Sequence, residues 1–257
     1  MFPLPAFQEE EVVLTVKNLS VSYPNNPVLN DLNFVLKPGD FLAVLGKNGS
    51  GKTTLLRAIA GNVKYTGEIR YNDKVLTKLP RTERAKIVGV VEQGMSPAPF
   101  SVYDVVCMGR TPYARMFSWS MEDLKMVEHA LKKVGVWELR NRLITEISAG
   151  ELQKTLIAKV LAQDVKILLL DEPTSHLDLQ AQLTALSIIQ QLRNEGKIII
   201  GVFHDINLAR IASHVLFLAR GEYLFGKCSL INEEHMRRYL GVDNQLLAQY
   251  LGGYVHV

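Results

Sequence analysis

The sequence of 257 residues has little that would place it outside the cell or inside a membrane. Its two cysteines, Cys107 and Cys228, are too few for a disulfide framework, so we expect reduced thiols in a cytosolic protein. The N-terminus has no basic stretch and soon becomes acidic, unlike a secretory signal. The longest apolar runs, at 167–170 and 198–203, have the length of strands, far below the ~20 residues of a membrane span. If the protein works at a membrane, another protein must hold it there.

The sequence also has no large excess of positive or negative charge that would indicate a highly charged partner. The formal net charge is only +3 and is evenly spread, so we do not expect nucleic acid as the main partner. The longest run of like charge is the three glutamates at 9–11. Apolar residues make up 47% and charged residues 21%, which is typical of a globular protein with one sizeable core.

The apolar pattern predicts an α/β core interrupted by helices. From 12 to about 36, short β-type runs are separated by a Pro-Asn-Asn-Pro segment, which favours antiparallel hairpins. Residues 41–45 form a continuous apolar run, typical of a strand buried on both faces. The runs at 167–170 and 198–203 repeat that pattern later in the chain.

Between about 100 and 162 the apolar residues change to helical spacing. The two stripes are Leu124, Val127, Leu131 and Val134, and then Leu152, Leu156, Ile157, Val160 and Leu161. We therefore predict a single domain in which 12–92 and 163–257 form the core and 93–162 form a mostly helical inserted subdomain. The core should hold a parallel sheet, with an antiparallel β subdomain at the N-terminus.

A glycine-rich motif directly follows the predicted strand at 41–45. Residues 46–53 read GKNGSGKT and match the pattern G-x-x-x-x-G-K-[ST] at every position, which predicts a P-loop NTPase core. The N–H groups of such a loop surround phosphate oxygens, and the following helix presents its positive end to them. Lys52 would reach the β- and γ-phosphates of ATP, and the Thr53 hydroxyl would bind Mg²⁺. The predicted nucleotide contacts here are Gly46, Lys47, Asn48, Gly49, Ser50, Gly51, Lys52, Thr53 and Thr54.

Three titratable residues follow the two later strands. Asp171 and Glu172 end the run at 167–170, which would put Asp171 near the metal and Glu172 beside the γ-phosphate. A carboxylate there can deprotonate the attacking water, a role typically worth ~10²–10⁴-fold in rate. Acidic residues after a strand are commonly helix caps, but the phosphate loop favours catalysis. His204 follows 198–203 at the edge where parallel sheets bind ligands, which favours a γ-phosphate sensor over a structural histidine.

In this order the motifs resemble those of the ATPase subunit of ABC (ATP-binding cassette) transporters, over nearly the whole chain. The resemblance assigns 46–53 as the Walker A loop and 167–172 as the Walker B strand. It assigns Tyr23 as the aromatic that stacks on adenine and Gln93 as the Q-loop glutamine that contacts nucleotide and Mg²⁺. The D-loop would be 175–178, with Asp178, and His204 would be the switch histidine.

What the resemblance implies is a head-to-tail homodimer that buries two ATP molecules. Each nucleotide would lie between the Walker motifs of one copy and the signature motif of the other. Two integral-membrane permease subunits would hold the dimer at the cytoplasmic face of the cell membrane, and an extracytoplasmic binding protein would deliver the substrate. Nucleic acid is not among the implied partners.

The signature motif departs from the family pattern L-S-G-G-Q. Residues 147–151 read ISAGE, so Ser148 and Gly150 remain to contact the γ-phosphate while Ala149 replaces a glycine. A methyl group restricts backbone conformations with positive φ, and our hypothesis is that the site stays active but slower. We expect the helix from 152 onward to direct its positive end at the phosphate.

The stretch at 99–113 points to a branch of the family. Its Gly-Arg-x-Pro-Tyr element resembles that of ATPases serving importers of iron chelates, haem, cobalamin and oxyanions such as molybdate. From the residues alone, the same stretch is a capped helix followed by a turn at Pro112. We also expect no C-terminal regulatory domain of the kind found in sugar-importer ATPases, since the sequence stops at Val257.

Other functions fit the sequence less well. The alternative of an ABC exporter ATPase stays open, and only the stretch at 99–113 and the chain architecture argue against it. A soluble ABC ATPase acting on nucleic acid or the ribosome would show a coiled-coil insertion, tandem cassettes or a basic face. Asp171, Glu172 and His204 argue against a P-loop kinase or GTPase. Lys52, Glu172 and His204 argue against a catalytically silent nucleotide binder. The transported substrate is not encoded, because the ATPase does not touch it.

Overall fold

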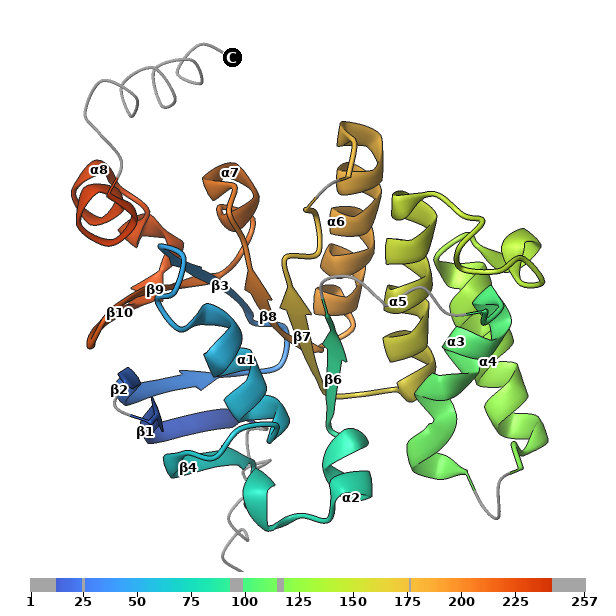
Figure 1. Cartoon of the computed structure of the whole chain (residues 1–257), viewed down its shortest axis with the longest axis horizontal. Helices are drawn as coiled ribbons and strands as arrows, with labels where there is room; N and C mark the ends of the chain where they lie inside the picture. The colour runs from blue at the N-terminus through green and yellow to red at the C-terminus, as the bar shows by residue number, and fades with distance from the viewer. Residues whose placement is uncertain (1–12, 25, 93–98, 115–117, 176, 242–257) are drawn as a thin grey trace, which may run out of the picture.

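Two β-sheets form the frame of the structure, a computed structural model (Figure 1). It describes residues 13–24, 26–92, 99–114, 118–175 and 177–241. The first sheet is antiparallel, with strand order β2-β1-β4-β5. Its strands are β1 (Leu14–Tyr23), β2 (Asn26–Leu36), β4 (Thr66–Tyr71) and β5 (Lys74–Val75). The predicted antiparallel subdomain at the N-terminus is therefore confirmed.

The second sheet is mostly parallel and has the order β10-β9-β3-β8-β7-β6. Its strands are β3 (Phe41–Gly46), β6 (Val88–Val91), β7 (Ile167–Asp171), β8 (Ile198–Val202), β9 (His214–Ala219) and β10 (Glu222–Lys227), of which only β10 runs antiparallel to its neighbour. Because β3, β7 and β8 run in the same direction, their carboxyl ends meet at one edge, the usual ligand-binding edge of such sheets. Strand β8 ends one residue before the predicted end at 203.

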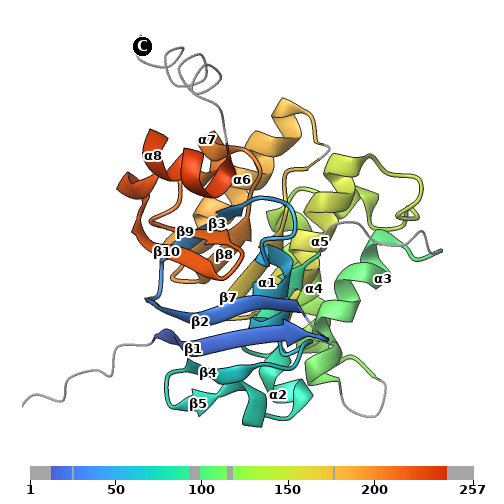
Figure 2. The ribbon, with the colours of Figure 1, turned by 60° about the vertical axis from the view of Figure 1, so that its left-hand side comes forward.

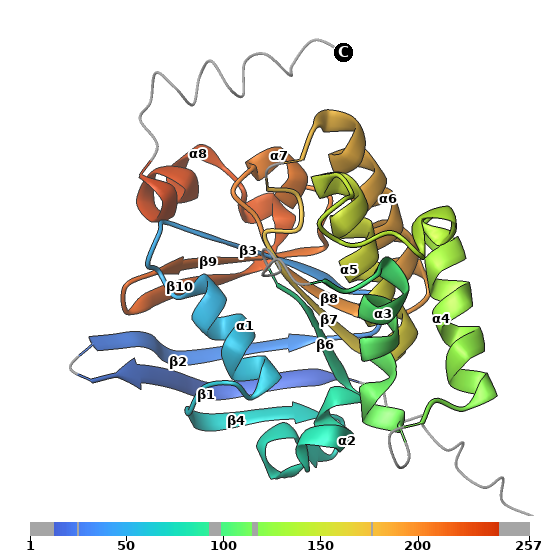
Figure 3. The ribbon, with the colours of Figure 1, turned by 45° about the vertical axis from the view of Figure 1, so that its right-hand side comes forward.

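Helix α1 (Lys52–Ala60) lies between the two sheets (Figure 3). Leu55 and Ile59 are fully buried there, in a cluster that includes Leu42 and Val44 from β3 and apolar residues of β1 and β2. The alternate β3 residues, such as Phe41, belong to a second cluster on the opposite face of the sheet. Both faces of β3 are covered, which is why this strand is a continuous apolar run rather than an alternating one.

The helices on the opposite face are α3 (Val102–Cys107), α4 (Met121–Lys133), α5 (Ala149–Gln163) and α6 (Leu179–Asn194). The first three follow β6 and precede β7, and they stand together at one side of the molecule (Figure 2). Helix α5 begins at Ala149, three residues before the predicted start. The reason is a capping box: the Ser148 hydroxyl accepts a hydrogen bond from the Glu151 N–H, and the Glu151 carboxylate accepts one from the Ser148 N–H.

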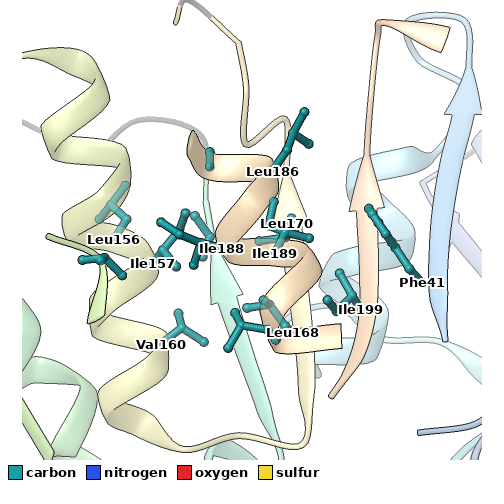
Figure 4. Packing of buried hydrophobic residues seen from close by; sticks show 14 of the residues in the cluster. Phe41, Leu156, Ile157, Val160, Leu168, Leu170, Leu186, Ile188, Ile189 and Ile199 are labelled. Carbon is teal, nitrogen blue, oxygen red and sulfur yellow. The ribbon is translucent and has the colours of Figure 1, made fainter. Parts of the chain in front are cut away.

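Helices α5 and α6 share one hydrophobic core with the sheet. Leu156, Ile157 and Val160 of α5 face Ile188 of α6 and Leu168 of β7 (Figure 4). Because this core is continuous across the predicted subdomain boundary, the division at 93–162 stays a prediction.

The remaining elements are short: η1 (Leu76–Lys78), α2 (Arg81–Ala85), η2 (Met108–Tyr113), η3 (Trp137–Leu139), α7 (Ile206–Ala209), η4 (Cys228–Leu230), α8 (Glu233–His235) and η5 (Met236–Leu240). Cys107 and Cys228 are both free thiols. None of the helices in the described ranges has the length and apolar character needed to cross a membrane.

Removing a side chain between the sheets should weaken the whole fold. We expect Leu55→Ala to lower the free energy of unfolding by about 2–5 kcal/mol, because the fully buried leucine would leave a cavity next to the phosphate loop. Urea denaturation measures the change. The matched control is Leu183→Ala on α6, where the side chain is 58% exposed, and it should change stability by less than about 0.5 kcal/mol. Equal losses in the two variants would contradict this description of the core.

Candidate nucleotide-binding site

The loop between β3 and α1 folds so closely that two of its positions admit only glycine. A Cβ atom on Gly46 would lie 2.4 Å from the Leu218 carbonyl oxygen of β9 and 2.5 Å from the Ser50 hydroxyl. Gly51 has a φ of 104° and begins α1 as its N-cap. L-residues with side chains rarely adopt that conformation. The glycines of the motif therefore serve close backbone packing as well as phosphate binding.

The Lys52 side chain is turned back into this loop. It is only 7% exposed, and its Nζ donates hydrogen bonds to the Gly46 carbonyl at 2.8 Å and the Lys47 carbonyl at 3.0 Å. Burial lowers the pKa of Lys52, while the nearby Glu172 and Asp171 carboxylates act to raise it. The ammonium group is thus placed at the centre of the site.

The hydroxyl of Ser50 is buried and has no hydrogen-bond partner among the described residues. A buried polar atom without a partner is costly and calls for a ligand or water. Together with the N–H groups of a glycine-rich loop at a helix N-terminus, it fits the oxygens of a nucleotide phosphate. Thr54 follows in the first turn of α1.

Thr53 and Asp171 come together from two different elements. The Thr53 hydroxyl donates to the Asp171 Oδ1 atom at 3.3 Å, which joins the start of α1 to the end of β7. Burial raises the pKa of Asp171, and the bond from Thr53 acts against that rise. Hydroxyl and carboxylate oxygens are ligands that Mg²⁺ prefers. No group of three or more His, Cys, Asp or Glu side chains in the described part of the chain could hold a metal ion, so phosphate and water oxygens would have to complete its coordination.

Glu172 and His204 also meet at the carboxyl edge of the sheet. The His204 Nε2 atom lies 2.5 Å from Glu172 Oε1, and the Ser175 hydroxyl donates to Glu172 Oε2 at 2.9 Å. Burial acts to raise the pKa of Glu172, but the bonds from His204 and Ser175 outweigh it and hold the pKa below its ordinary value. Glu172 also adopts a left-handed backbone with a φ of 51°. The lowered pKa favours the ionised carboxylate, and the two hydrogen bonds orient it, an arrangement compatible with the predicted role of general base.

The signature and D-loop residues lie elsewhere on the chain. Ser148, Gly150 and Asp178 line one depression, whereas Lys47 and the next three loop residues line another, beside Arg220 and Tyr239. Ser148 and Asp178 are the N-caps of α5 and α6, and a Cβ atom on Gly150 would lie 2.9 Å from the Ala181 Cβ. One chain thus presents two groups of predicted site residues.

The hypothesis that the Ala149 methyl group strains the signature motif does not fit this structure. Ala149 is the first residue of α5, and it is not among the described residues with positive φ. The right-handed helical region is open to alanine as well as to glycine, so the methyl group causes no backbone strain at this position. Tyr23 ends β1 with 38% of its surface exposed, as an adenine-stacking ring would need. Gln93 lies outside the described residues, so its predicted contact with nucleotide and metal stays a prediction.

Sequence reasoning missed two residues that shape the site. Ser175 was assigned only to the D-loop, yet its hydroxyl positions the Glu172 carboxylate. Glu151 occupies the last position of the signature motif, where the family pattern has Gln, and its carboxylate accepts a hydrogen bond from the Ser148 hydroxyl at 2.8 Å. The spacing S-x-x-E was a usable signal for Glu151, whereas no local signal marked Ser175.

A family model described as "ABC transporter" matches residues 29–175, more than half of the chain. The chain belongs to the ABC transporter family. It is therefore an ATP-binding subunit with the ATPase fold and activity of that family, and the prediction from the motifs is confirmed.

Relatives and solved structures place it near importers. It is 38% identical over 218 residues to the manganese transport system ATP-binding protein MntB of Halalkalibacterium halodurans, covering 83% of this chain and 86% of the relative. It is 36% identical over 222 residues to the hemin import ATP-binding protein HmuV of Gloeobacter violaceus, covering 82% and 80%. An inward-facing ABC transporter of a proposed metal-chelate type superposes with a TM-score of 0.80 at 31% identity, over 90% of both chains.

The hydrogen bond from Ser175 gives a pH test. A carboxylate acts as a base only when ionised, so the predicted role of Glu172 implies that activity is lost as the pH falls through its lowered pKa. Ser175→Ala removes one of the bonds that oppose burial, so the pKa of Glu172 rises and the acid limb of kcat moves to higher pH. ATPase rates across the acid range measure the shift, with Ser187→Ala, an exposed position on α6, as control. An acid limb that does not move would show that Ser175 has no such role.

Proposed function

We propose that two copies of this chain form a head-to-tail dimer that hydrolyses ATP and thereby drives import through a membrane permease. The observation that supports it is the separation of the site residues into two groups. Ser148, Gly150 and Asp178 line one depression, and the phosphate loop from Lys47 onward lines another. A second copy in the opposite orientation would bring the first group of one chain to the second group of the other, twice over.

Within each composite site, the residues of one chain would hold and hydrolyse the nucleotide. Lys52 and the loop N–H groups would bind the phosphates, and Tyr23 would stack on adenine. Thr53 and Asp171 would hold Mg²⁺, with Gln93 as a further contact; when bound, the ion would neutralise charge on the β- and γ-phosphates. Glu172 would take the proton of the attacking water, with its carboxylate oriented by His204.

The partner copy would complete the site from the γ-phosphate side. The Ser148 hydroxyl and Gly150 N–H would contact the γ-phosphate at the N-terminus of α5, where four N–H groups and the helix dipole favour negative charge. Asp178 would contribute from the adjoining D-loop. Ser148 would have to exchange its bonds with Glu151 for bonds to phosphate, so closure would open a capping box.

We propose a metal ion or a metal chelate as cargo, including haem. The support comes from the relatives, one named for manganese transport and one for hemin import, and from the metal-chelate type structure. These names favour import over export. Two permease subunits would hold the dimer at the cytoplasmic face of the membrane, and an extracytoplasmic binding protein would deliver the cargo. Cobalamin, a cobalt chelate, falls within this class, whereas oxyanions remain a prediction from the sequence alone.

The catalytic role is tested by Glu172→Gln. We expect ATP binding to persist and kcat to fall by ~10²–10⁴-fold, because the amide cannot accept the proton of water. With ATP present, the variant should sediment as a stable dimer in analytical ultracentrifugation. Glu128→Gln, which alters an exposed ion pair with Lys132 on α4, is the control and should behave as the wild type. Wild-type turnover in Glu172→Gln would refute the assignment.

The cargo is tested by purifying the chain with its permease and binding protein. We expect the isolated binding protein to carry a metal or metal chelate, identified by mass spectrometry and elemental analysis. Adding the loaded binding protein to the transporter in liposomes should stimulate ATP hydrolysis and move the metal toward the side that holds the ATPase. A metal-free organic cargo, or movement in the opposite direction, would contradict the proposal.

A further inference from the structure

The Gly-Arg-x-Pro-Tyr element at 109–113 has no role in the site described above, yet it is packed directly on α5. It forms part of η2, which lies against the last turns of that helix. A Cβ atom on Gly109 would be 2.1 Å from the Lys159 carbonyl oxygen and 3.3 Å from the Gln163 N atom. Backbone meets backbone here, so this position has no space for a side chain.

Arg110 and Tyr113 bind the carbonyl groups at the end of α5. The Arg110 Nη1 atom donates to the Ala162 carbonyl at 2.7 Å, and the Tyr113 hydroxyl donates to the Gln163 carbonyl at 3.1 Å. The last four carbonyls of a helix have no partner within the helix, and a cation there also interacts favourably with the helix dipole. The guanidinium group lies 3.8 Å from the centre of the Tyr113 ring, so each side chain holds the other in place.

Arg110 is itself fixed by a buried ion pair. Its Nε atom donates to the Asp123 Oδ1 atom at 2.8 Å, and both side chains are less than one-tenth exposed. The other Asp123 oxygen accepts hydrogen bonds from the Ser120 N–H and hydroxyl at the start of α4. Burial acts to raise the pKa of Asp123, but the bonds from Ser120 and Arg110 hold it below the ordinary value. The Arg110 fork therefore joins the start of α4 to the end of α5.

The same end of α5 is bonded to the core. The Gln163 Nε2 atom donates to the Ala85 carbonyl at 2.6 Å, just before β6. By contrast, the side of α5 contacts α6 and β7 through apolar residues such as Leu156 and Val160 (Figure 4). Apolar contact is non-directional, whereas hydrogen bonds are directional. The bonds at Ala162 and Gln163 therefore add directional contacts to the apolar packing, and these constrain the rotation and axial position of the helix at its C-terminal end.

The far end of this helix carries Ser148. Helix α5 has 15 residues, so at 1.5 Å per residue the two ends are roughly 22 Å apart. We propose that Arg110 and Tyr113 are positioning residues for ATP hydrolysis, which lock the C-terminal end of α5 and so place Ser148 at the partner's γ-phosphate. This inference rests on the proposed head-to-tail dimer. Neither residue touches nucleotide, and both act through the helix.

The test uses the double variant Arg110→Lys/Tyr113→Phe. Lysine keeps the charge beside Asp123 but lacks the planar fork that also reaches Ala162, and phenylalanine keeps the ring but not the hydroxyl. We expect ATP affinity of the monomer to stay as in the wild type, because the phosphate loop is untouched. The kcat should fall by about tenfold to a hundredfold, the effect expected of a misplaced catalytic group. Binding of a fluorescent ATP analogue, steady-state ATPase rates and melting temperature are measured together.

The matched control is Arg140→Lys, where an arginine also stacks on an aromatic ring, that of Trp137 at 4.5 Å, and bonds a carbonyl, but on η3 rather than on α5. It should keep the wild-type kcat. If the double variant does not fold, Tyr113→Phe alone replaces it. This change removes only the hydrogen bond to Gln163, and it must still lower kcat. A variant with lowered melting temperature but wild-type kcat would overturn the inference.

A second readout separates this inference from the dimer on which it rests. In a Glu172→Gln background, ATP should drive the parent chain into dimers, and the added Arg110→Lys/Tyr113→Phe changes should shift the population toward monomers at the same concentration. Dimerisation that the added changes leave unaltered would refute the positioning role alone. A Glu172→Gln parent that stays monomeric with ATP would refute the proposed dimer and the inference together.

Discussion

The burial of one ammonium group, that of Lys52, organises the site. A buried charge must be compensated, and the chain does this with the Gly46 and Lys47 carbonyls and with the Asp171 and Glu172 carboxylates close by. The loop must turn tightly to bring these two carbonyls to the ammonium group. This requires glycine at position 46, where β3 lies against the Leu218 carbonyl of β9. The carboxylates are in reach only because β7 is parallel to β3 in the same sheet, one strand removed. Fold and phosphate site are thus consequences of the same packing.

A second constraint follows from the length and direction of α5. The phosphate loop is built into the central sheet, but the signature serine caps a helix whose other end is bonded to η2 and to the segment before β6. The chain therefore presents a rigid half of a site at the sheet and another half at the helix N-terminus. A composite site made by two copies uses both halves, and any change that moves the helix alters how they fit.

Local patterns predicted most of the fold and the phosphate loop, because a fixed spacing of Gly, Lys and Thr after a buried strand is encoded in adjacent residues. The predicted start of α5 is wrong by three residues, because Ser148 and Glu151 of the signature motif also form the cap of this helix. The contacts of Gly46 with Leu218, of Ser175 with Glu172 and of Arg110 with Ala162 depend on tertiary packing. No pattern within the sequence marks them. The roles assigned to the individual site residues stay predictions, those of Gln93, Tyr23 and Asp178 as well as those of Glu172 and His204.

The measurement that tests the composite site most directly is complementation between two inactive variants. Lys52→Ala removes the phosphate contact of one half-site, and Ser148→Arg blocks the other. In a head-to-tail mixed dimer, one site would then pair an intact Lys52 with an intact Ser148, while the second site would carry both defects. The account predicts that mixing the two variants restores ATP hydrolysis that neither shows alone, with a rate that rises with the product of their concentrations. A mixture no more active than its components would contradict it.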